Sequence, residues 1–187
     1  MQTPTHFLTT AFLDRVLPTA SLSRHTPAFL VGSILPDLPF TLLTVFYEIY
    51  YRWFAQLPSN PYNSIMEYLH FDLFFNDPVW IIGHNMFHSL VINTSLLFIG
   101  GLALRYRRRW GNLVFWLAVG MLLHTIIDIF THTSDGPLMF FPLNWTYRFA
   151  SPVSYWEAEY FGWYVMAAEY TINIAILAYF FARWQRQ

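Results

Sequence analysis

Four long apolar segments limit what this 187-residue chain can fold into. A bilayer hydrocarbon core about 30 Å thick is crossed by roughly 20 residues of helix, and each segment is about that long. A further apolar stretch that begins near His6 is too short to span, so we expect an amphipathic or re-entrant helix there. The sequence therefore predicts an all-α integral membrane bundle in a single domain, residues 1–187, with four transmembrane helices at about 28–50, 79–104, 112–130 and 160–182.

The composition fits a membrane protein and excludes other classes. Charged residues make up 11% of the chain, against about 25% in an average soluble domain, which is too little charge to cover a soluble surface. The net charge of −1 and the absence of lysine give no basic field that would attract nucleic acid. Cysteine is also absent, so any metal ion must be held by His, Asp or Glu side chains.

The arginine positions predict an orientation in the membrane. Arginines at 105 and 107–109 crowd the link between the second and third segments, and Arg183 and Arg186 follow the fourth. Since short loops rich in Lys and Arg stay in the cytoplasm, we expect this link and both termini to be cytoplasmic. The predicted location is the inner (plasma) membrane of a bacterium.

The third apolar segment carries a row of ionisable residues. His124, Asp128 and His132 are spaced at i, i+4 and i+8, so a continuous helix places them in one stripe. Asp135 follows near the end of that stripe, where Gly136 and Pro137 are expected to end the helix. Charged residues inside a membrane cost about 2.5–3.5 kcal/mol on insertion scales, so such a stripe indicates function.

Two other segments carry matching residues. His84 and His88 are one helical turn apart near the extracytoplasmic start of the second segment, at the same depth as the stripe in the third. Asp37 lies between Pro36 and Pro39, which must break the first segment, and broken helices in lipid line a protein or water cavity. We therefore expect His84, His88 and the stripe to converge on one metal ion beside Asp37, since first-row metals accept mixed imidazole and carboxylate ligands.

Less specific interpretations remain open. A lone histidine in a membrane helix is often a hydrogen-bonded packing residue, and a row of such groups can also form a proton relay. His70 and Asp72, in the first extracytoplasmic loop, could support a site or simply lie at the interface. Glu169 lies inside the fourth segment with no partner at a helical spacing, and the sequence does not explain it.

Several motifs together resemble a known family. TPTHF near the start, GSILPDLP, a histidine pair ending in HS, HxxxD in a later apolar helix and the stretch DIFTHTSDGPLMFFPLNWTYRFASPVSYWE occur in this order. They resemble the inner-membrane metal-dependent hydrolases, which are described as similar to zinc-dependent phospholipase C. The resemblance runs from His6 to about Trp163. It implies metal ligands at His6, Asp37, His88, His124 and Asp128, with His84, His132 and Asp135 as companions.

Two departures from that family stand out. Many relatives have HRGxTHS where this chain has GHNMFHS, which is one residue shorter and lacks the Arg-Gly pair. In the related branch, further histidines follow the TH…D segment, whereas this chain has Gly-Pro-Leu-Met at 136–139. These departures concern activity more than fold, and they favour a non-catalytic relative as the main alternative.

The sequence thus predicts a membrane-bound hydrolase of phosphoesters or phospholipid headgroups that uses one or two divalent ions, zinc by preference, and metal-activated water. The metal ligands are predicted among His6, Asp37, His84, His88, His124 and Asp128, and Asp135 or His132 would transfer the proton. Membrane lipid is the expected partner and substrate source. The alternatives are a non-catalytic subunit or assembly factor of a membrane-protein complex, and a proton or ion transporter, for which four spans without a repeat form a small scaffold.

Overall fold

The computed structural model describes residues 1–17, 25–58 and 62–186, and the predicted all-α fold is confirmed, because these residues contain no strand. The long helices are α1 (Thr3–Val16), α2 (Thr26–Gly32), α3 (Asp37–Trp53), α6 (Pro78–Asn85), α7 (Leu90–Arg105), α8 (Gly111–Thr131) and α9 (Gly162–Trp184). Short pieces fill two connections: α4 (Ile65–Tyr68), the π-helix η1 (Leu69–Leu73) and α5 (Phe74–Asn76), and later η2 (Ala158–Tyr160).

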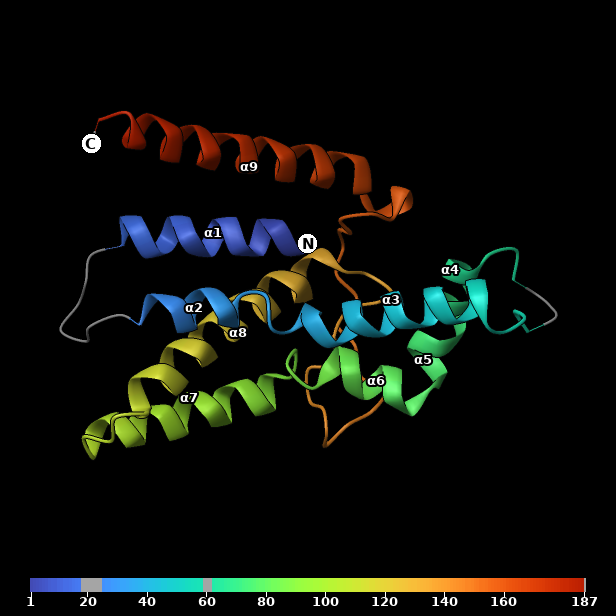
Figure 1. The fold of residues 1–187 in the computed structure, drawn as a ribbon, viewed down its shortest axis with the longest axis horizontal. Helices are drawn as coiled ribbons and strands as arrows, with labels where there is room; N and C mark the ends of the chain where they lie inside the picture. The colour runs from blue at the N-terminus through green and yellow to red at the C-terminus, as the bar shows by residue number, and fades with distance from the viewer. Residues whose placement is uncertain (18–24, 59–61, 187) are drawn as a thin grey trace.

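The helices form a bundle (Figure 1). α9 lies along one edge with α1 beside it, α2 and α8 occupy the middle, and α7 lies along the other edge. α3 and α6 continue α2 and α7 beyond the centre of the molecule, where α4 and α5 close the far end. The α7–α8 turn and the C-terminus lie at the opposite end. The N-terminus lies near the centre of the molecule, where the Met1 amino group contacts Asp128, so the two termini do not lie together, contrary to the prediction that both are on one side.

The number of spans follows from helix length and from two bends. α8 and α9 are each long and apolar enough to cross a membrane alone. α2 with α3, and α6 with α7, pass the same test only as pairs, bent by 50° and 43°. The described chain therefore has two membrane-crossing helices, or up to four if each bent pair is one span, the number that the sequence predicts.

Glycines let the central helices approach closely. Gly32 of α2 faces Gly120 of α8, and a Cβ added to Gly32 would lie 3.1 Å from the Gly120 Cα. On the other side of α8, a Cβ at Gly100 of α7 would lie 2.6 Å from the Phe115 backbone nitrogen. Because membrane helices associate through close packing rather than through a hydrophobic driving force, these contacts fix α8 between α2 and α7.

The outer helices turn apolar side chains outward. On α9, the exposed side chains include Ile174, Leu177 and Phe181, whereas its buried positions include the carboxylate of Glu169. A soluble protein would show the reverse distribution. This inside-out pattern is the one expected of a helix that faces lipid.

The first break lies where the prolines predict it. α2 ends at Gly32, a turn follows, and α3 begins at Asp37, with Pro36 at its N-cap. The Ser33 carbonyl no longer receives a helical hydrogen bond, and it accepts one from the His124 side chain at 2.7 Å instead. The break therefore exposes both a carboxylate and a carbonyl to the middle of the bundle, as expected for irregular backbone at membrane depth.

The second break contradicts the predicted continuous helix over 79–104. α6 ends at Asn85 and α7 begins at Leu90, capped by Ser89, whose hydroxyl accepts the Ile92 N–H at 3.2 Å. His88 therefore lies in the break, and His84 and His88 do not share one helical face. A side chain of α7 stabilises the break, because the Asn93 amide donates to the Phe87 carbonyl at 2.9 Å.

The helix of the third segment, whose predicted span is 112–130, does not continue to the end expected at Gly136 and Pro137. α8 stops at Thr131, and His132 has extended backbone, so the stripe does not continue along a helix to Gly136 and Pro137. The reason is the loop before α9, which folds back onto this point. The Tyr155 N–H donates to the Thr131 carbonyl at 2.9 Å, and the Ser151 N–H donates to the His132 carbonyl at 3.3 Å.

Candidate metal centre

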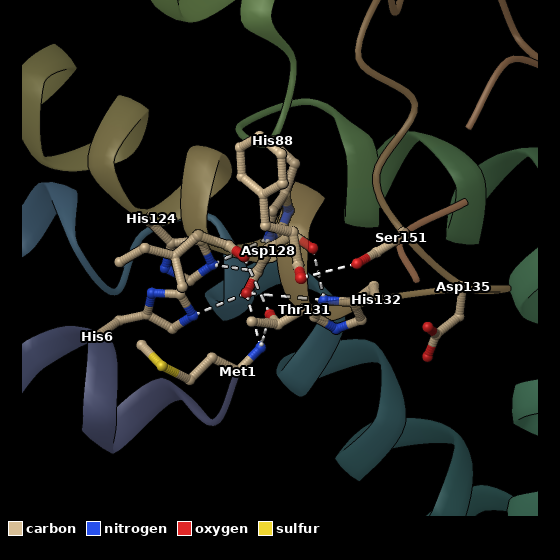
Figure 2. Close-up of polar contacts among 12 residues, drawn as sticks. Met1, His6, His88, His124, Asp128, Thr131, His132, Asp135 and Ser151 are labelled. Carbon is tan, nitrogen blue, oxygen red and sulfur yellow. Dashed lines mark hydrogen bonds and ion pairs between the residues drawn. The ribbon is translucent and has the colours of Figure 1, made fainter. Parts of the chain in front are cut away.

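Four ionisable side chains meet where the two breaks face α8. They are Asp37 at the start of α3, His88 in the α6–α7 break, and His124 and Asp128, one turn apart on α8. One ligand atom from each lies within 4.8 Å of the others. Figure 2 shows His88, His124 and Asp128 pointing toward one another. We call these four residues the central cluster.

The distances within the central cluster are short. The Nε2 atoms of His88 and His124 are 3.0 Å apart. Asp128 Oδ2 lies 2.9 Å from the Nε2 of His124 and 3.3 Å from that of His88. Asp37 Oδ1 lies 3.3 and 3.5 Å from the same two nitrogens. Both imidazoles therefore face both carboxylates through the same nitrogen.

Backbone carbonyls orient the two imidazoles. His88 Nδ1 lies 2.6 Å from the His84 carbonyl, and His124 Nδ1 lies 2.7 Å from the Ser33 carbonyl. A carbonyl can only accept a hydrogen bond, so each Nδ1 carries a proton, and in a neutral ring Nε2 keeps its lone pair. This arrangement is the usual support of metal-binding histidines.

The two carboxylates are supported in the same way. The Thr3 hydroxyl donates to Asp37 Oδ2 at 2.5 Å, which leaves Oδ1 facing the histidines. His6 Nε2 contacts Asp128 Oδ1 at 2.9 Å, and the Met1 amino group donates to the same oxygen at 2.8 Å. Each member of the central cluster is thus held through the atom that faces away from the centre.

The donor set fits a divalent metal ion. Two lone-pair nitrogens and two carboxylate oxygens this close together repel one another unless a positive charge lies among them. Ligand atoms about 2.0–2.2 Å from a tetrahedral ion lie roughly 3.3–3.6 Å apart. The separations that involve a histidine nitrogen, 2.9–3.5 Å, reach this range or fall just short of it. Two Asp and two His therefore match both the charge and the size of such an ion.

Two predicted ligands, His6 and His84, lie beside the central cluster and outside it. The His6 ring stacks on the His124 ring with centroids 3.6 Å apart, and its Nε2 contacts Asp128 instead of facing the centre. The His84 ring lies 4.6 Å from the His88 ring, and neither of its buried nitrogens has a hydrogen-bond partner. The geometry gives His6 the role of orienting Asp128, while His84 faces a neighbouring cavity.

A cavity of about 360 Å³ opens directly beside the central cluster. Asp37 and Asp128 reach it from the cluster, and His84, His132 and Asp135 line it as well. Its remaining wall is formed by residues 1–4, Phe40, Thr41, His70, Phe74 and Tyr155. The structure therefore brings seven of the eight predicted site residues to the cluster or to this cavity, and His6 packs behind them.

The two predicted proton-transfer residues present free acceptors to the cavity. His132 Nδ1 lies 3.0 Å from the Asp128 backbone carbonyl, which leaves its Nε2 as the acceptor atom. Asp135 accepts the Trp156 indole N–H on Oδ2 at 3.0 Å, while its buried Oδ1 has no hydrogen-bond partner. In Figure 2, Asp135 lies to the side of His132 away from the central cluster.

The loop before α9 supplies two further groups. Burial raises the pKa of the Tyr155 phenol, which lines the cavity and stays protonated at neutral pH. Burial lowers the pKa of the Arg148 guanidinium to about 10, and the charge of Asp135 opposes this shift. Arg148 is therefore still a cation at pH 7, and it is held by the Gly136 carbonyl and by the Phe74 ring, whose centroid is 5.1 Å away.

The structure explains Glu169, which the sequence leaves without a partner. Its Oε1 accepts the Gln2 backbone N–H at 2.8 Å and the Thr5 hydroxyl at 2.5 Å. The Thr5 hydroxyl in turn accepts the Asn173 amide at 2.7 Å. The first turn of α1, which carries Thr3 against Asp37, is thus fixed to α9 by a buried carboxylate. The unpaired N–H groups of a helix start also favour a negative charge at this point.

Glu169→Ala is expected to destabilise the protein by about 1–3 kcal/mol, because the Gln2 N–H and the Thr5 hydroxyl lose a buried acceptor. Thermal unfolding in detergent measures this effect. Tyr170→Phe is the matched control, since it removes only the exposed Gln2–Tyr170 hydrogen bond one position away. Equal melting temperatures for the two variants would show that the carboxylate does not hold α1.

Comparisons with known proteins agree with a membrane location. The family model described as YdjM inner membrane protein matches residues 1–186. No curated protein and no solved structure matches the chain. The apolar helices and the family match together place the protein in the inner membrane. Because the match covers almost the whole sequence, the chain belongs to the YdjM inner membrane protein family.

Proposed function

We propose that this protein is a membrane-bound metal-dependent hydrolase that cleaves a phosphoester in the headgroup of a membrane lipid. The observation that carries the proposal is the central cluster itself: four ligand atoms converge, each side chain is supported from behind, and two of them reach an open cavity. A structural metal site is usually closed on all sides, whereas a catalytic one keeps a position open to water and substrate. The cavity supplies that opening.

The residues around the cavity have distinct roles in this proposal. A divalent ion bound there would activate water and polarise a phosphoryl oxygen. His132 Nε2 accepts the proton of the attacking water, because its Nδ1 is committed to the Asp128 carbonyl. Asp135 receives that proton on its free Oδ1 and passes it to the oxygen of the leaving group. The Tyr155 hydroxyl remains available as a hydrogen-bond donor to a phosphate oxygen.

The position of the site supports a lipid substrate. The central cluster lies toward the Thr131 end of α8, whose 21 residues span about 30 Å, the thickness of the hydrocarbon core. The site is therefore near the level of the headgroups on one side of the membrane. A cavity of about 360 Å³ is at the small end of ligand pockets, which suits a headgroup better than a whole lipid.

Metal-dependent turnover tests this function. The purified protein in detergent, loaded with zinc or manganese, is incubated with a panel of phospholipids and phosphomonoesters, and released phosphate or headgroup is measured. We expect hydrolysis of at least one member, abolished by a chelator and restored by the metal. Bound metal without turnover of any member would favour the non-catalytic alternative. Proton uptake coupled to a solute in proteoliposomes would favour transport.

A further inference from the structure

The turn between α7 and α8 has an unusual residue at its tightest point. The Arg108 N–H donates to the Ala103 carbonyl at 2.8 Å, and the Arg107 N–H donates to the Leu104 carbonyl at 2.9 Å. These two bonds form the Schellman motif that ends many helices, in which the residue with positive φ is usually glycine. Here Arg107 holds that position with φ of 54°. Arg107 therefore has a backbone conformation that is unfavourable for any residue other than glycine.

The arginines of this turn have no side-chain partner among the residues that the structure describes. Arg105, Arg107, Arg108 and Arg109 are all exposed. Across the described residues, none of the four makes an ion pair or a side-chain hydrogen bond, although Arg52 and Arg148 both do. Four unpaired cations on five consecutive residues form a strong local attraction for an anion.

An apolar groove leads up to these arginines. It has a volume of about 300 Å³ and is lined by Ile99, Leu102, Ala103, Tyr106, Arg108 and Trp110. Its lining is almost entirely carbon, and Arg108 is its only charged residue. Tyr and Trp at one end of a membrane helix mark the level of the headgroups. The groove thus runs from the depth of the acyl chains to the depth of the phosphates.

The groove is built on a rigid hairpin. A Cβ added to Gly111 would lie 2.7 Å from the Leu104 backbone nitrogen, so α8 starts in direct contact with the end of α7. Gly100 makes a similar close approach one helical turn deeper. Close backbone packing therefore sets the backbone of the turn that carries Arg108 and Trp110.

We propose that this groove binds one anionic phospholipid, with an acyl chain against Ile99 and Leu102 and the headgroup phosphate on Arg108. The charge complementarity between four unpaired arginines and a phosphate diester selects an anionic over a zwitterionic lipid. The site is separate from the central cluster, because the two lie at opposite ends of α8. It does not depend on the proposed hydrolase activity.

Native mass spectrometry tests this site. Delipidated protein in an uncharged detergent is titrated with phosphatidylglycerol and, in parallel, with phosphatidylcholine. We expect one tightly held phosphatidylglycerol and no equivalent phosphatidylcholine. Arg108→Gln should weaken phosphatidylglycerol binding about fivefold, the effect of one arginine at a membrane surface. Arg107→Gly, which also lies outside the groove lining, should retain most of the affinity while relaxing the backbone at a position that favours glycine.

Arg105→Gln is the matched control, because it removes the same charge from the same turn but lies outside the groove lining. We expect it to retain most of the affinity for phosphatidylglycerol. Equal losses for Arg105→Gln and Arg108→Gln would overturn the proposal and indicate diffuse charge attraction alone. Equal binding of the two lipids by the unmodified protein would also overturn it.

Discussion

His124→Ala is expected to remove the bound divalent ion from the purified protein while the helical bundle stays folded. The change deletes the one cluster side chain whose Nε2 lies within 3.3 Å of three other ligand atoms. Loss of even a supporting residue behind a metal ligand costs 10–100-fold in affinity, so loss of a ligand should cost more than about 100-fold. Metal content by mass spectrometry and affinity by competition with a chromophoric chelator measure the effect.

His70→Ala is the matched control for that prediction. His70 also lines the cavity, but it packs against Phe74 and Trp156 and does not belong to the central cluster. It should keep the metal content of the unmodified protein. Circular dichroism and gel filtration in detergent separate metal loss from unfolding. If a folded His124→Ala protein binds metal as tightly as the unmodified protein, His124 is not a ligand.

The double variant His132→Ala, Asp135→Asn is expected to keep its metal and to lose turnover. Neither residue belongs to the central cluster, and both present a free acceptor atom to the cavity. Removal of a general acid–base group lowers rates by about 10²–10⁴-fold. The loss should appear in kcat, with KM little changed, because these groups act on the proton in transit and bind the substrate weakly in the ground state.

The two single variants separate the contribution of His132 to turnover from that of Asp135. His132→Ala should show the larger loss of turnover. His132 contacts the Asp128 carbonyl beside the central cluster, whereas Asp135 lies on the far side of His132. Asp135→Asn keeps an oxygen that can accept the Trp156 indole N–H, so the loop should remain in place. A double variant that hydrolyses the substrate at the normal rate would exclude both residues from proton transfer. Loss of metal in either single variant would assign that residue to the metal site instead.

Much of the fold could be predicted from the sequence because lipid imposes strict rules on length and composition. The apolar runs coincide with α8, α9 and the two bent helix pairs, and Pro36 and Pro39 marked the first break. The second break carries no proline or glycine. It depends on bonds to the loop before α9: the Leu90 N–H donates to the Met139 carbonyl at 3.0 Å, and the Ser89 hydroxyl donates to the Phe141 carbonyl. Those bonds involve partners that no local pattern reveals.

The site could be predicted in part for a similar reason. Asp37, His88, His124 and Asp128 stand out because ionisable groups are costly in lipid. Their support does not stand out, because Thr3 and Thr5 are ordinary residues of an N-terminal helix until α1 is placed against α9. His84 illustrates the opposite error. Its spacing from His88 predicts a shared helical face, but the helix ends at Asn85, and only His88 joins the central cluster.

The most direct test of the central claim is the metal content of the protein as it comes from the membrane. Protein purified in detergent without added metal or chelator is analysed by inductively coupled plasma mass spectrometry against its measured concentration. We predict about one divalent transition-metal ion per chain, bound tightly enough to survive gel filtration. If neither zinc, manganese nor iron is found, and none binds on reloading, the central cluster is a hydrogen-bonded network and the metal-centre account is wrong.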